Sequence, residues 1–354
     1  MENKKQYEKQ KKRNYNQYIE EEGIKEEKSK ENKNKIKELL KPKLKEDENN
    51  QINLIDELKI NNTKTELKDI SKEIIYNNGD KYIGDIKNEL KHGQGIIYYN
   101  EKNNEQRIKY EGTWKNDKPN GKGQLYYNNG NKYEGDFKND LFDGKGIYYY
   151  NNNEKYDGEW KNNKREGKGI YYYINGDRYD GEWKNNKREG NGIYYFNSGN
   201  KYDGEWKNNK REGNGIYYYN NGDRYEGFWK NSKREGKGIL YYDNGYKYDG
   251  EWKNGLTEGK GIFYCINGDR YEGEFKNGKK EGKGILYYND GDRYEGEWKN
   301  GSEEGKGISY YNDGDIYNGE WKNGTKEGKG IFYYNNGDKE IGQYMNGYEI
   351  DIQS

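Results

Sequence analysis

Lysine and arginine recur at a fixed spacing in the middle of the chain. The motif Lys-Asn-Asn-Lys-Arg-Glu-Gly begins at residue 161 and returns at 184 and 207, with a close variant at 230. A row of basic side chains can hold anionic lipid headgroups, with about 1 kcal/mol contributed by each basic residue near a charged surface. The alternative is that charged loops keep the protein soluble and block edge-to-edge pairing of strands. The candidate lipid-binding residues are Lys161, Lys164, Arg165, Lys184, Lys187, Arg188, Lys207, Lys210, Arg211, Lys230, Lys233 and Arg234.

Aromatic side chains recur with the same spacing. Each copy holds a tyrosine, and in eight of the eleven copies a tryptophan follows four residues later. Such a row of rings could form a groove that receives a peptide or a second copy of the chain. The alternative is a structural role, in which the twist of the sheet and the neighbouring side chains cover the rings. The candidate groove residues are Tyr156, Trp160, Tyr179, Trp183, Tyr202, Trp206, Tyr225 and Trp229.

Residues for catalysis or metal binding are scarce. The chain has one histidine, His92, expected in a solvent-facing loop, and one cysteine, Cys265, expected as a buried or half-buried filler. There is no nucleophile elbow, phosphate-binding loop or kinase motif. Carboxylate pairs such as Asp157 and Glu159 recur identically, whereas catalytic pairs need one singular environment that separates their pKa values. We therefore predict no catalytic residue, no metal site and no cofactor.

The charge balance argues against nucleic acid as a partner. The 64 basic and 64 acidic residues give a formal net charge of zero. A glutamate interrupts each basic motif and lowers the local field, whereas nucleic-acid binding needs a basic surface.

The spacing itself is the strongest signal in the sequence. The first tyrosine of each copy stands every 23 residues from Tyr110 to Tyr317, and an earlier copy begins 28 residues upstream at Tyr82, with an insertion within 101–109. A fixed period over eleven copies is the mark of a repeat array. Each unit of such an array buries itself only against its neighbours.

The consensus of the copies resembles the MORN repeat (membrane occupation and recognition nexus). The similarity rests on Tyr-[Glu/Asp]-Gly-x-[Trp/Phe]-Lys, then Glu-Gly-x-Gly-[Ile/Leu], then an Asn-Gly turn. The resemblance implies an elongated ribbon of β-hairpins. MORN arrays occur in membrane-junction proteins, in cytoskeletal scaffolds and beside lipid-kinase or methyltransferase domains. Together with the lack of catalytic motifs, the resemblance leads us to expect a non-catalytic scaffold for protein partners, placed at a membrane or the submembrane cytoskeleton. The alternative is an anionic-lipid (phosphoinositide) binding module.

The composition agrees with such an array and with a cytoplasmic localisation. The 354 residues include 42 tyrosines, and the mean hydropathy is −1.65. A conventional core of this length needs far more aliphatic side chains. One cysteine excludes an intramolecular disulfide framework and fits a reducing compartment. We see no signal peptide and no apolar run of membrane-spanning length, so we expect any membrane contact to come from the surface.

Three segments are expected along the chain. Residues 1–73 are charged and of low complexity, so we expect a mostly disordered or weakly helical tail, with a segment that folds on a partner as the alternative. Residues 74–339 form the array. Residues 340–354 are a degenerate repeat that caps the end, with Gly342 in the first glycine position and Tyr344 in the tryptophan position.

One repeat, 156–178, predicts one antiparallel hairpin. An odd period of 23 residues requires one odd turn or a bulge in each repeat, because side chains alternate between the two faces of a strand. We assign the odd turn to Asn175-Gly176, as a three-residue connection with a left-handed glycine. The other connection is then an even loop, roughly 162–167. This register places Trp160 opposite Gly169, Gly158 opposite Tyr171 and Tyr156 opposite Tyr173, so that rings lie over glycines.

Overall fold

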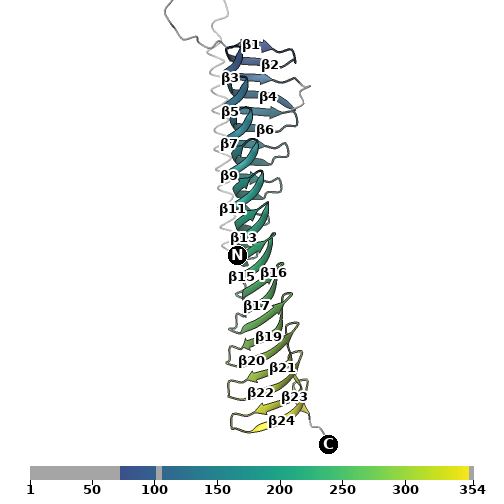
Figure 1. Ribbon diagram of the computed structural model, residues 1–354. Coiled ribbons are helices and arrows are strands. Elements are labelled where there is room, and N and C mark those ends of the chain that lie inside the picture. Colours follow the sequence, from purple (N-terminus) through teal and green to yellow (C-terminus); the bar gives the residue numbers. More distant parts are fainter. Residues whose placement is uncertain (1–71, 101–105, 351–354) are drawn as a thin grey trace, which may run out of the picture. The chain divides into compact units, whose positions relative to one another are not determined.

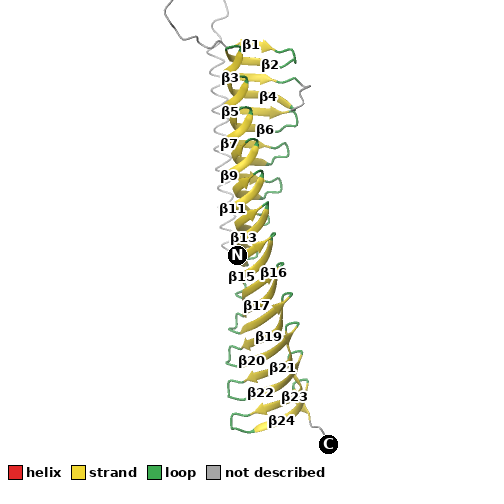
Figure 2. Cartoon of the chain, viewed as in Figure 1, coloured by secondary structure: helices red, strands yellow, loops and turns green. Residues whose placement is uncertain are grey.

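A single open antiparallel sheet makes up the described part of the protein. The computed structural model describes residues 72–100 and 106–350, so the predicted tail lies outside the described residues except for its last two. Figure 1 shows the strands following one another along one axis, and Figure 2 shows every described element as a strand or a loop. Each strand from β2 to β24 pairs with the strand before it and the strand after it in the chain, and β1 and β25 form the two ends of the sheet. The fold predicted from the repeat is therefore confirmed.

The described residues form 25 strands, and two strands make one repeat. These are β1 Lys72–Ile75, β2 Lys81–Lys87, β3 Leu90–Tyr98, β4 Arg107–Lys115, β5 Lys118–Tyr127, β6 Lys132–Lys138, β7 Leu141–Tyr149, β8 Lys155–Lys161, β9 Lys164–Tyr172, β10 Arg178–Lys184, β11 Lys187–Tyr195, β12 Lys201–Lys207, β13 Lys210–Tyr218, β14 Arg224–Lys230, β15 Lys233–Tyr241, β16 Lys247–Lys253, β17 Leu256–Tyr264, β18 Arg270–Lys276, β19 Lys279–Tyr287, β20 Arg293–Lys299, β21 Ser302–Tyr310, β22 Ile316–Lys322, β23 Thr325–Tyr333, β24 Lys339–Met345 and β25 Tyr348–Ile350.

The turn at the Asn-Gly sequence forms as predicted. The Tyr173 amide donates to the Asp177 carbonyl at 3.0 Å, and the Gly176 amide donates to the Tyr173 carbonyl at 3.0 Å. These bonds close a three-residue connection, and Gly176 has a φ of 86°. A residue without a Cβ takes this left-handed conformation at no steric cost. The three-residue turn with a left-handed glycine is therefore confirmed.

The predicted cross-strand register is wrong. Tyr156 pairs with Tyr171, Gly158 with Gly169, and Trp160 with Arg165. The connection is not a loop over 162–167 but a two-residue turn, Asn162-Asn163, in which both residues have positive φ (49° and 64°). Asparagine tolerates this conformation, and two such residues match the twist of the strands. The polar residues 164–167, which we expected in a loop, instead form the first half of β9.

A bulge in β9 absorbs the residues that the short turn does not use. Between the pairs Gly158–Gly169 and Trp160–Arg165, Glu159 alone lies opposite the three residues 166–168. Gly167 sits in this bulge with a φ of 62°. The bulge adds two residues, an even number, so Arg165 and Gly169 still point to the same face of the sheet.

The tyrosine rings of the core lie over pairs of glycines on adjacent strands. Tyr156 is fully buried, and a Cβ on Gly169 or Gly158 would collide with its phenol. The Tyr156 hydroxyl donates to the Glu159 carbonyl at 3.0 Å, so the ring is held along its own strand. The expectation that glycines make room for rings is confirmed, but the covering ring is the tyrosine of the same hairpin.

Tyrosine and tryptophan alternate along the inner face, which we define as the face that carries Tyr156 and Trp160. Tyr156 makes edge-to-face contacts with Trp160 at 5.1 Å and with Trp183 of the next repeat at 5.3 Å, both between ring centroids. Each such contact contributes about 0.5–1.5 kcal/mol beyond the burial of area. Phe137 and Phe275 take the tryptophan position in their repeats, and Tyr344 takes it in β24.

Candidate interaction surfaces

The predicted aromatic groove is filled by the protein itself. Its four tyrosines are fully buried, and its four tryptophans are 3 to 7% exposed. Burial raises the pKa of Tyr156 well above its ordinary value because the phenolate would lose its hydration. The structure therefore places all eight predicted groove residues in the core of the array.

The arginines of the basic motif complete this inner face. The guanidinium of Arg165 lies 4.5 Å from the ring centroid of Trp183, and its Nη2 donates to the Asn186 carbonyl at 3.0 Å. Arg211 repeats the arrangement, at 4.3 Å from Trp229. Cation–π contacts of this kind are attractive because the ring face carries negative charge density. Four of the twelve predicted lipid-binding residues, namely Arg165, Arg188, Arg211 and Arg234, are half-buried in this way.

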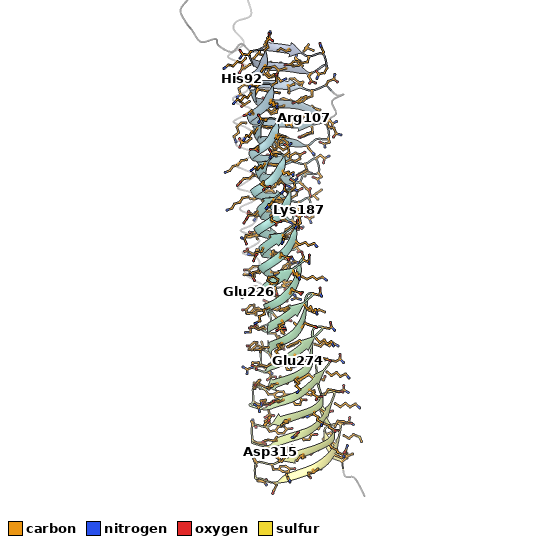
Figure 3. All side chains as sticks on the ribbon, in the orientation of Figure 1. His92, Arg107, Lys187, Glu226, Glu274 and Asp315 are labelled. Carbon is orange, nitrogen blue, oxygen red and sulfur yellow. The ribbon has the colours of Figure 1, made fainter. Side chains whose placement is uncertain are left out.

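The lysines of the same motif lie on the turn edge, which we define as the edge formed by the two-residue turns such as 162–163. Lys187, labelled in Figure 3, is exposed and stands next to the turn 185–186. All eight predicted lysines are exposed there in four successive repeats: Lys161, Lys164, Lys184, Lys187, Lys207, Lys210, Lys230 and Lys233. The structure thus divides the predicted lipid-binding residues into eight surface lysines and four arginines bound to the core.

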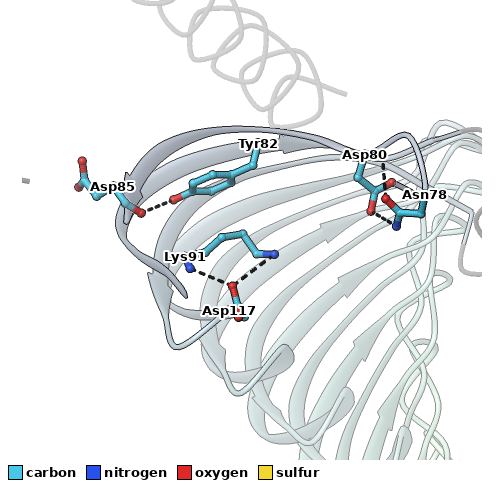
Figure 4. A network of polar contacts seen from close by, with 6 residues as sticks. All are labelled: Asn78, Asp80, Tyr82, Asp85, Lys91 and Asp117. Atoms are coloured by element: carbon cyan, nitrogen blue, oxygen red, sulfur yellow. Dashed lines mark hydrogen bonds and ion pairs between the residues drawn. The ribbon is translucent and has the colours of Figure 1, made fainter. Parts of the chain in front are cut away.

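Hydrogen bonds join each turn to the repeat before it. The amide of Asn185 donates to the Glu166 carboxylate at 2.9 Å, and the amide of Arg165 donates to the Asn186 side-chain oxygen at 2.8 Å. The glutamate of the basic motif is therefore a structural acceptor. The first repeat is joined to the next turn in the same way, because the amide of Lys91 donates to the Asp117 carboxylate and the Lys91 ammonium pairs with it (Figure 4).

The outer face, opposite the buried rings, carries a surface that the sequence analysis did not single out. Asp157 pairs with Ile170, and Glu159 lies opposite the bulge. Because the period is constant, carboxylates and isoleucines form rows along the array. An open hollow of about 1010 Å³ lies on this face over the repeats from β15 to β22. Its side chains include Ile262, Ile285, Ile308, Asp249, Glu251, Glu272, Glu274, Glu295, Glu297, Lys237, Lys260, Lys283 and Lys306. The alternation of Asp157 and Glu159 with the inward rings was the signal that could have found it.

The two residues with candidate reactive side chains lie in different repeats. His92 is in β3 and half-buried, with its Nδ1 buried and without a hydrogen-bond partner in the described residues, so the prediction of a solvent-facing loop is wrong. The misplaced loop follows from the wrong register. Cys265 is partly buried as predicted, and burial raises the pKa of its thiol. Within 72–100 and 106–350 we find no cluster of three or more histidine, cysteine or acidic residues that could hold a metal ion. Nor does that part of the chain hold a helix both long and apolar enough to cross a membrane.

Comparison with solved structures gives only weak likenesses. The TCP domain of SAS-4 (dCPAP) from Drosophila melanogaster, solved with a proline-rich motif of Ana2, has 17% identity and a TM-score of 0.26, over 49% of this chain and 83% of that domain. The TCP10 domain of CPAP from Danio rerio has 10% identity and a TM-score of 0.24, over 62% of this chain and 93% of that domain. Likenesses this weak support no argument about function. No curated protein matches the chain.

The comparison with protein families identifies the repeat. The model of the MORN repeat matches eleven consecutive units, at residues 82–103, 110–132, 133–155, 156–178, 179–201, 202–224, 225–245, 248–270, 271–293, 294–316 and 317–339. These units are the hairpins described above, with the tyrosine and the glycine pair in the same places and a tryptophan four residues after the tyrosine in eight of the eleven. The chain therefore belongs to the MORN-repeat family of scaffold arrays.

Proposed function

We propose that the array is a non-catalytic scaffold that binds a protein partner along its outer face. The observation that carries this proposal is the 1010 Å³ hollow over β15 to β22. The inner face is occupied by the chain's own rings and arginines, so a partner finds recurring contacts on the outer face. Three half-buried isoleucines, Ile262, Ile285 and Ile308, repeat there at equal intervals.

The chemistry of the hollow favours a helical segment as the occupant. Two strands per repeat give a spacing of about 10 Å between successive isoleucines. One heptad of an α-helix rises about 10.5 Å, so an apolar side chain every seven residues meets one isoleucine per repeat. A helix satisfies its own backbone, whereas an extended chain on this face would find the sheet's backbone groups already paired. Six carboxylates against four lysines line the hollow, which favours basic flanks on the helix.

The test is a photo-crosslinking residue placed at Ile285 in the full chain. We expect it to capture a helical segment with heptad spacing, and binding of that purified partner to weaken at least tenfold in the variant Ile262→Asn, Ile285→Asn, Ile308→Asn. The matched control is Ile170→Asn, at the same position of a repeat outside the hollow. Unchanged binding by the triple variant would refute the outer face as the docking surface. Capture of a second copy of the chain would instead establish self-association.

A second candidate function is peripheral binding to an anionic lipid surface at the cytoplasmic side of a membrane. The observation that favours it is the exposure of eight lysines on one edge in four successive repeats. At about 1 kcal/mol for each lysine near the surface, such a row is sufficient for salt-sensitive binding. We expect the chain to float with vesicles that carry phosphoinositide or phosphatidylserine, but not with neutral vesicles. Replacing the eight lysines with glutamine should abolish flotation, and flotation that survives this change would contradict the proposal.

A further inference from the structure

The turn edge changes its chemistry between the first repeats and the rest. In eight repeats, from Glu166 to Glu327, a glutamate after the turn accepts the amide of the first asparagine in the next turn. These bonds are 2.9 to 3.1 Å long. The equivalent position holds His92, Asn120 and Asp143 in the three repeats before them. A carboxylate is thus part of the usual edge, and Asn120 replaces it with a neutral and shorter side chain.

The first turn amides of these three repeats lack the acceptor that the glutamate provides elsewhere. The Asn139 amide, which is the equivalent of the Asn185 amide, has no hydrogen-bond acceptor within the described residues, and neither have the Asn116 and Asn162 amides, which follow His92 and Asp143. Of the three, only Asn139 follows a position with a neutral amide side chain, Asn120. A hollow of about 620 Å³ opens at this place and is lined by both Asn120 and Asn139. The position where other repeats hold a negative group is therefore open and accessible.

Cations surround the same hollow. Lys115, Lys118 and Lys138 line it, together with two carboxylates, Asp136 and Asp143. Asp136 is already paired with Lys122 at 2.7 Å and also accepts the Lys145 amide at 2.9 Å. The lining is therefore net positive, in contrast to the outer-face hollow, and its charge is complementary to an anion.

We propose that this hollow binds a phosphate-type oxyanion, one of whose oxygens takes the place of the absent glutamate carboxylate. That oxygen accepts the Asn139 amide, and the three lysines balance the charge. Charge-assisted hydrogen bonds from a backbone amide and from ammonium groups are the usual means of holding phosphate in proteins. The source of the phosphate is a soluble phosphate compound or a lipid headgroup, since both present the same oxygens.

Residues 46 positions downstream provide a matched test within the same chain. Lys161, Lys164 and Lys184 correspond to Lys115, Lys118 and Lys138, and Glu166 corresponds to Asn120. The substitution Asn120→Glu should supply the carboxylate and close the site. The substitution Glu166→Asn should remove a carboxylate and open a second site. Asn120→Ala keeps the hollow open and is the control.

The experiment is isothermal titration of the full chain with inorganic pyrophosphate at fixed ionic strength. We expect one site in the natural chain, affinity within threefold in Asn120→Ala, at least tenfold weaker binding in Asn120→Glu, and a stoichiometry near two in Glu166→Asn. Melting curves confirm that each variant is folded. Absence of binding in the natural chain, or unchanged binding in Asn120→Glu, overturns the proposal. A stoichiometry that stays at one in a folded Glu166→Asn variant also overturns it, because the open carboxylate position would then not define the site.

Vesicles that carry phosphatidylinositol phosphate distinguish the two sources. Vesicle binding that pyrophosphate displaces, and that Asn120→Glu reduces, identifies a headgroup as the ligand. Pyrophosphate binding without vesicle binding identifies a soluble phosphate compound. Asn120→Glu leaves the eight lysines at 161–233 and the outer-face isoleucines intact, so its result is independent of both proposed functions.

Discussion

The indole Nε1–H of Trp183 donates a 3.0 Å hydrogen bond to the carbonyl oxygen of Gly169 in the preceding repeat. The same bond joins Trp160 to Gly146 and Trp206 to Gly192. Each tryptophan is thereby fixed to the backbone of its neighbour, at the glycine that the neighbour's tyrosine covers. The sheet is one layer thick, yet its rings are buried, because each repeat supplies the cover for the one before it.

Trp183→Phe should weaken the array modestly. Phenylalanine keeps an aromatic ring in contact with Tyr179 and Tyr156, as Phe137 and Phe275 do in their repeats, but it cannot donate to the Gly169 carbonyl. The loss of one buried hydrogen bond costs about 1 kcal/mol. Urea unfolding followed by circular dichroism measures it. An unchanged midpoint would show that the indole bond contributes nothing to stability.

Gly169→Ala should be far more destabilising than an alanine at an open glycine. The new Cβ would collide with the ring of Tyr156, which has no free space to move. We expect a loss of about 3 kcal/mol or more, in the range of overpacked core sites. Gly337→Ala is the comparison, because no heavy atom lies within 4 Å of the place that its Cβ would take and only the φ of 95° opposes alanine. Equal losses in the two variants would contradict the assignment of Gly169 to ring packing.

Arg211 and Lys210 are neighbours with opposite expected roles. Arg211→Gln removes the contact with Trp229 and the 2.9 Å bond to the Ser232 carbonyl, so we expect a loss of about 1–2 kcal/mol in the free energy of unfolding. Lys210 is exposed, so Lys210→Gln should leave stability within about 0.5 kcal/mol. Vesicle binding should instead be weakened by Lys210→Gln and left unchanged by Arg211→Gln. A stable Arg211→Gln variant with weakened vesicle binding would reverse this division of the basic motif.

High pH should unfold the array through its buried tyrosines. Burial raises the pKa of Tyr179, whose ring is fully buried on the inner face, well above its usual value of 10. The folded state therefore keeps its protons where the unfolded chain releases them. The stability is fully present below about pH 10 and is lost as the pH rises toward the folded pKa values. Phenolate absorbance and circular dichroism should change together above pH 10. Ionisation of all tyrosines near pH 10 in a folded array would contradict the burial.

The period of 23 residues and the local turn chemistry were readable from the sequence alone. They determined the family, the hairpin architecture, the odd turn at Asn175-Gly176 and the covering of glycines by rings, although not which residues pair across the strands. These features depend on residues close together in the chain, such as the left-handed Gly176, and on a repetition that multiplies a weak signal by eleven.

The tertiary structure decided the register, the bulge at Gly167 and the division of the basic motif. A short Asn-Asn turn with a bulge and a longer loop without one satisfy the same odd period, so alternation of side chains does not distinguish them. The position of Arg165 over Trp183 depends on the next repeat, which supplies both the ring and the Asn186 carbonyl. Contacts between repeats depend on how far the sheet curls and twists. That curvature is a property of the packed rings rather than of any one stretch of sequence.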